Sequence, residues 1–96
     1  MVTTALQAAS AYGYETVVKL LLEKQADVNI QGELFGTALQ AASAGGHETV
    51  VKLLLEKEAD VNIQGGEYGT ALQTALAGGH EAVVKLLLEK QANVNA

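Results

Sequence analysis

Four residue types are missing from this chain of 96 residues, which has no cysteine, proline, tryptophan or arginine. Without cysteine there can be no disulfides and no thiolate metal ligands, which excludes a secreted scaffold held by disulfides. All six basic residues are lysine and the net charge is −5. This balance argues against nucleic-acid binding, which usually needs a basic surface. It also argues against phosphopeptide recognition through arginine clusters.

Long apolar runs are absent as well. No stretch approaches the roughly 18 apolar residues of a membrane span. The N-terminus lacks the charged region and apolar core of a signal peptide. Apolar residues nevertheless make up 49% of the chain, enough to form a core. We therefore expect one small, soluble, cytoplasmic domain that has no contact with a membrane.

The segment from residue 37 to residue 69 has a copy on each side of it. Thr4, Thr37 and Thr70 are 33 residues apart (37−4 and 70−37), and the first two copies match at 27 of 33 positions. A period of this length, with two helices and a turn in each copy, is typical of stacked helical repeats. It predicts a single domain, 1–96, with repeats at 4–36, 37–69 and 70–96.

The motifs inside the repeat resemble those of the ankyrin family. The sequence Thr-Ala-Leu-Gln-Ala-Ala at 37–42 resembles the family's T-P-L-H-x-A signature, and the Gly-His pair at 46–47 and the segments 50–55 and 59–62 resemble the rest of its repeat. The resemblance covers nearly the whole chain. It implies an all-α solenoid of three ankyrin repeats that binds a protein partner without catalysis.

The near identity of the copies indicates either recent duplication or deliberate design. The motif Gly-Gly-Glu-Tyr-Gly before the third copy resembles ankyrin tracts at the ends of fungal NACHT-type immune receptors. The alternative is a designed or consensus array, a structural scaffold with no native partner.

Helix boundaries can be predicted from short motifs within each copy. Each copy opens with the pattern T-x-x-Q, which predicts a capping box at the start of the first helix; the pairs are Thr4/Gln7, Thr37/Gln40 and Thr70/Gln73. Glycine is expected to end these helices in the left-handed region, at Gly13, Gly46 and Gly79. Where the family has a glycine after the second helix, this chain has Gln25, Glu58 and Gln91. A left-handed backbone there would cost roughly 1 kcal/mol at each site.

We find no constellation that indicates catalysis, a metal or a cofactor. The histidines, His47 and His80, lie one repeat apart, roughly 8–10 Å at helix packing distance, which is too far to share one ion. We interpret each as bonding backbone near its interhelical turn, with Tyr14 in the same position of the first copy. No serine combines with histidine and a carboxylate, and the glycine-rich loops lack a P-loop lysine. We therefore expect no enzyme activity.

The expected function lies in the surface. The resemblance implies that a partner contacts the hairpin tips and the exposed side of the first helices. The positions that this places at the interface are Ala11, Tyr12, Glu33, Leu34, Phe35, Ala44, Glu67, Tyr68 and Ala77. Leu34 is the strongest candidate for an apolar contact, because Phe35 and Tyr68 are more simply explained by rings that pack under their own turns.

The two ends of the array are not polar. The third copy keeps the apolar residues of its second helix and has Leu76 where earlier copies have serine, and the first copy keeps Val17 and Leu20. Terminal repeats normally carry a polar outer face. We therefore expect self-association through uncapped terminal repeats, either head to tail or between like ends.

Overall fold

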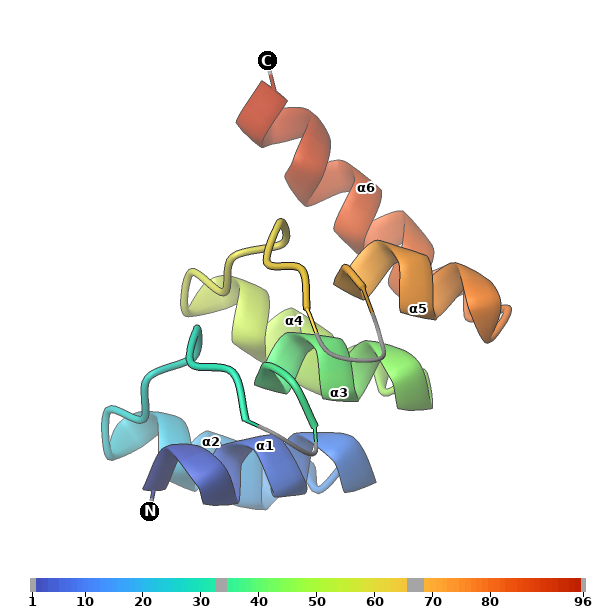
Figure 1. Ribbon diagram of the computed structural model, residues 1–96. Helices are drawn as coiled ribbons and strands as arrows, with labels where there is room; N and C mark the ends of the chain where they lie inside the picture. Colours follow the sequence, from blue (N-terminus) through green and yellow to red (C-terminus); the bar gives the residue numbers. More distant parts are fainter. Residues whose placement is uncertain (1, 33–34, 66–68, 96) are drawn as a thin grey trace.

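The computed structural model describes residues 2–32, 35–65 and 69–95. These residues form three helix pairs stacked in successive layers (Figure 1), as the predicted all-α solenoid requires. The first helices are α1 (Val2–Tyr12), α3 (Ala38–Gly45) and α5 (Ala71–Ala77), and the second helices are α2 (Glu15–Glu23), α4 (Glu48–Glu56) and α6 (Glu81–Asn95).

The core lies between the layers. First helices pack on first helices, α1 on α3 and α3 on α5, while α2 packs on α4 and α4 on α6. On the first helices the buried positions include small residues such as Ala9, Ala42 and Ala75, which allow close approach. The largest buried side chains are leucines, among them Leu54 and Leu87. Each buried leucine contributes about 1.5–3 kcal/mol of hydrophobic stabilisation.

The predicted capping boxes form in the second and third repeats. The Thr37 Oγ accepts a hydrogen bond from the Gln40 backbone N–H at 3.1 Å, and the Gln40 side chain accepts from the Thr37 N–H at 2.7 Å. Thr70 and Gln73 repeat this arrangement. Both threonines have extended backbone, and each directly follows a left-handed glycine, Gly36 or Gly69.

The capping box predicted at Thr4 is wrong. The helix α1 begins at Val2, so Thr4 lies inside its first turn with an exposed side chain. The helix continues past Thr4 to Val2, so Thr4 is not in the extended backbone that a cap needs. Gln7 still donates from its side chain to the Ile30 carbonyl at 2.8 Å, as Gln40 donates to the Ile63 carbonyl at 3.2 Å.

Left-handed residues occur at the predicted glycines and at two further turns. Gly13, Gly46 and Gly79 have φ of 74°, 71° and 69°. Gln25 and Glu58 also adopt positive φ, 63° and 67°, although neither is glycine. Both of these turns therefore carry the strain that a Cβ introduces in this region.

The turn expected at Gln91 is wrong, because α6 continues through this residue to Asn95. In the first two repeats the chain must turn back to reach the next first helix. At Gln91 the chain instead stays in the helix. Continuing the helix satisfies the backbone N–H and C=O groups without a left-handed residue.

A hairpin connects the first and second repeats. The backbone N–H groups of Gly32 and Gly36 each donate to the carbonyl of the other, at 2.9 and 3.2 Å. Gly36 has φ of 69°, which a residue with a side chain adopts only at a cost. These two bonds close the base of the loop, and the residues predicted at its tip lie outside the described part of the chain.

We predict that Thr37→Ala lowers the free energy of unfolding by about 1 kcal/mol, because the cap is lost. Thr4→Ala is the matched control, and alanine there should be neutral or slightly stabilising because the site is inside a helix. Ser43→Ala should also cost less than Thr37→Ala, since the buried Ser43 Oγ has no hydrogen-bond partner among the described residues. Urea midpoints measure all three, and equal midpoints for the three variants would contradict the assignment.

We predict that Glu58→Gly stabilises the protein. Removing the Cβ relieves about 1–2 kcal/mol of left-handed strain, which exceeds the roughly 0.5–1 kcal/mol entropic cost of glycine. Gln91→Gly should have the opposite sign and cost about 0.8–1 kcal/mol, since that residue is helical. Thermal unfolding of both variants tests the pair, and a lower melting temperature for Glu58→Gly would refute the strain argument.

Candidate partner-binding surface

An exposed aromatic pair lies where α1 ends. Tyr12 is the last residue of α1 and is 62% exposed, and its ring stacks on that of Tyr14 with centroids 5.6 Å apart. Gly13 separates them with left-handed backbone, which brings the two rings to the same side of the turn. Tyrosine presents a large apolar face with a polar tip. The pair is therefore suited to contact with another protein.

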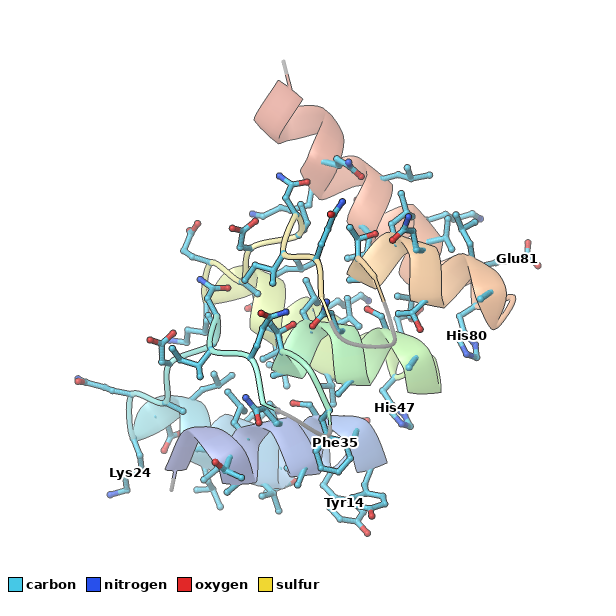
Figure 2. All side chains as sticks on the ribbon, viewed as in Figure 1. Tyr14, Lys24, Phe35, His47, His80 and Glu81 are labelled. Atoms are coloured by element: carbon cyan, nitrogen blue, oxygen red, sulfur yellow. The ribbon has the colours of Figure 1, made fainter. Side chains whose placement is uncertain are left out.

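Both histidines connect their repeats to the preceding ones. The His47 Nε2 lies 3.0 Å from the Ala11 carbonyl oxygen, and the His80 Nε2 lies 3.0 Å from that of Ala44. A carbonyl can only accept, so Nε2 carries the proton in each case. Figure 2 shows Tyr14, His47 and His80 one above another along a single edge. The expected bonds to backbone are present, and each acceptor belongs to the neighbouring repeat.

The position of each imidazole depends on nearby glycines. A methyl group on Gly45 or on Gly78 would lie well inside van der Waals contact with the histidine two residues later. Glycine therefore accompanies histidine in the second and third repeats. In the first repeat the corresponding residues are Tyr12 and Tyr14. The side chain at position 12 is tolerated there because no histidine ring occupies the same space.

The structure places the predicted interface residues in three groups. Tyr12 and Ala77 are exposed. Ala11, Ala44 and Phe35 are partly buried, and both alanine carbonyls accept from histidines. That the Phe35 ring packs under its own turn stays a prediction. Glu33, Leu34, Glu67 and Tyr68 lie outside the described residues.

Tyr14 is the surface residue that sequence reasoning missed. It is exposed and forms half of the aromatic pair, although the sequence suggested only that it replaces a histidine. A signal was present, because Tyr12 and Tyr14 both differ from their counterparts Gly45 and His47. Two substitutions on either side of a left-handed glycine indicate a local change in the surface.

Hydrogen bonds between successive loops fix the spacing of the hairpins. The Asn29 side-chain oxygen accepts from the Asp60 backbone N–H at 2.7 Å, and the Gln31 side chain donates to the Gln64 carbonyl at 3.1 Å. Each bond joins the loop of the first repeat to that of the second. These two loops are therefore held together before any partner binds.

No three His, Asp or Glu side chains within the described part of the chain are close enough together to hold a metal ion. None of its helices is long and apolar enough to cross a bilayer.

A family model for ankyrin repeats, in three copies, matches residues 6–96. The chain belongs to the ankyrin repeat family. Ankyrin repeats generally mediate protein–protein interaction and are typically noncatalytic. Comparison with curated proteins gives no match.

We predict an energetic coupling between Gly45 and His47. In the wild-type protein, Gly45→Ala should displace the imidazole and break its bond to Ala11. In a His47→Ala background the same substitution meets no ring. Gly45→Ala should therefore be less favourable in the wild type by about 1 kcal/mol, the usual net contribution of one hydrogen bond.

A double-mutant cycle from urea unfolding measures this coupling. The matched pair Gly78 and His80 should give a coupling of the same sign, because its geometry is the same. Additive effects at both pairs would show that the rings move aside without cost.

Proposed function

We propose that this ankyrin array binds a protein partner along the edge formed by the hairpin tips and the C-terminal ends of the first helices. The exposed tyrosine pair at the end of α1 is the observation that supports this surface most directly. Tyrosines are enriched in protein interfaces and often provide much of the binding energy. Leu34, in the adjacent hairpin, would add an apolar contact.

The loop segments 29–31 and 60–64 favour tight binding because hydrogen bonds already join them. The bonds from Asn29 to Asp60 and from Gln31 to Gln64 hold the two loops together. A surface that is ordered beforehand loses less conformational entropy on association. The chain's net charge of −5, with Glu33 and Glu67 at the tips, favours a partner with a basic rim. We propose that this interaction takes place in the cytoplasm, where a chain without cysteine loses no disulfide.

One observation favours a second candidate. The first two copies match at 27 of 33 positions, and uniformity of this kind suits a consensus or designed scaffold that has no native partner. A scaffold would present the same edge without any target for it.

We predict that the double variant Tyr12→Ala/Leu34→Ala binds the partner at least about tenfold more weakly, a loss of about 1.4 kcal/mol. The control is Lys24→Ala, because Lys24 is exposed and far from Tyr14 in Figure 2. The immobilised wild type and both variants would be exposed to the same cell lysate, and the affinity of any retained protein would then be measured by titration.

Retention by the wild type and by Lys24→Ala, with loss from the double variant, supports the proposed edge. Equal affinity of all three proteins would place the site elsewhere. If the wild type retains nothing that a heat-unfolded sample does not, the scaffold interpretation replaces the proposal.

A further inference from the structure

The junctions between second helices use the same residues twice. Leu22 of α2 and Leu53 of α4 line one groove, and Leu55 of α4 and Leu86 of α6 line the other. Charged residues from both helices flank each leucine pair. The first groove has Lys19 and Glu23 from the earlier repeat and Glu56 and Lys57 from the later one. The second groove has Lys52 and Glu56 from the earlier repeat and Glu89 and Lys90 from the later one. The residues of the earlier helix therefore form one set and those of the later helix another, and the two sets pack together at both junctions inside the chain.

Each end of the chain carries one of these sets without the other. At the C-terminal end, Leu88 on α6 corresponds to Leu22 and Leu55, and it is 49% exposed where they are 8% and 7% exposed. At the N-terminal end, Leu20 on α2 corresponds to Leu53 and Leu86 and is more than half exposed. We call the exposed surface with Leu88 and Val84 the trailing face, and the one with Leu20, Val17 and Tyr14 the leading face.

Charges at the two faces are complementary in the same way. The trailing face has Lys85 and Glu89 beside Leu88, and the leading face has Glu23 and Lys24 beside Leu20. These are the residue types that flank the leucines in both internal grooves. Val17 on the leading face is 43% exposed, whereas its counterpart Val50 is 1% exposed because the first repeat covers it.

The turns between helices show the same mismatch between the ends and the interior. Gly13 and Gly46 are covered by the rings of His47 and His80 from the following repeat, whereas a Cβ on Gly79 would have no atom within 4 Å. A hollow lined by Leu76, Gly79 and Val84 opens beside it. At the leading face, Tyr14 occupies the position of the histidines.

Two residues at the end faces, Leu76 and Tyr14, are larger and more apolar than their counterparts inside the array. Leu76 stands where Ser10 and Ser43 are fully buried, so a first helix stacked there would meet a larger, apolar side chain. Tyrosine is larger than histidine, and Tyr14 can fill the space over Gly79. The two changes lie on opposite faces, and they would meet only if one copy stacked on another.

We propose that copies of this chain stack head to tail, with the leading face of one copy on the trailing face of the next. The helix α2 of one copy packs on α6 of its neighbour as α4 packs on α2 within the chain. Such an interface is heterologous, so each copy can bind one neighbour at each end. Stacking leaves the Tyr12 edge accessible, because Gly45, the counterpart of Tyr12 inside the array, stays exposed. Tyr14 belongs to both surfaces, but the test below uses no partner, so its outcome does not depend on the proposed function.

The test uses one charged substitution on each face. Leu20→Glu blocks the leading face and Leu88→Glu blocks the trailing face, and both sites are exposed enough to leave the fold intact. Thr49→Glu adds the same charge at an exposed site of the central repeat and serves as the control. Circular dichroism and melting temperature confirm folding. Sedimentation from micromolar to millimolar protein in physiological salt gives the average mass.

The wild type and Thr49→Glu should grow beyond the mass of a dimer as concentration rises. Each face variant alone should associate at least tenfold more weakly, because every copy lacks the same face. A 1:1 mixture of the two variants should form dimers and stop there, since it contains one intact leading face and one intact trailing face per pair.

Three results would overturn the proposal. A wild type that stays monomeric to millimolar concentration shows that the faces do not attract each other. A face variant that dimerises by itself shows that like faces pair. A mixture that stays monomeric while the wild type associates, or a Thr49→Glu variant as weak as the face variants, shows that the association does not use these two faces.

Discussion

Stacking of one helix pair on the next is the interaction on which the rest of the structure depends. Helices of seven to nine residues, such as α3, α4 and α5, are too short to be stable alone in water. Their stability comes from the faces that neighbouring repeats cover. The central repeat illustrates this, because Val50, Val51 and Leu54 are almost completely buried. A fold of this kind gains stability repeat by repeat, through contacts between nearest neighbours.

Polar side chains set the geometry of that stacking. Imidazoles reach back to carbonyls of the preceding repeat, and amide side chains join successive loops. Hydrogen bonds have a preferred length and direction, whereas apolar contact is non-directional. The apolar core therefore supplies the attraction between layers, and these bonds fix how far each layer is rotated and shifted against the next. These hydrogen bonds therefore also determine the shape of the edge that we propose binds a partner.

Two left-handed turns show how the repeat tolerates a local conflict. Gln25 and Glu58 adopt a backbone that favours glycine, because the chain must reverse there to begin the hairpin. At Glu58, burial of Ala59 and Val61 in the core directly after the turn offsets the strain of the left-handed backbone. At Gln91 the backbone stays helical. Similar sequence thus adopts two conformations at corresponding positions of the repeats.

The sequence by itself determined the period, the helix pairs, the caps at Thr37 and Thr70 and the left-handed residues at Gly13, Gly46 and Gly79. Each of these depends on hydrogen bonds or backbone preferences within a few residues, which a short motif specifies. Only the tertiary structure decided that Thr4 lies inside a helix, that α6 continues past Gln91, that Tyr12 stacks on Tyr14, and that the acceptor for His47 lies in the preceding repeat. Nor could the motifs say that Leu88 would be exposed while Leu22 and Leu55 are buried, since all three occur in the same local sequence. Their difference comes from whether another repeat covers them, and that depends on contacts between residues far apart in the chain.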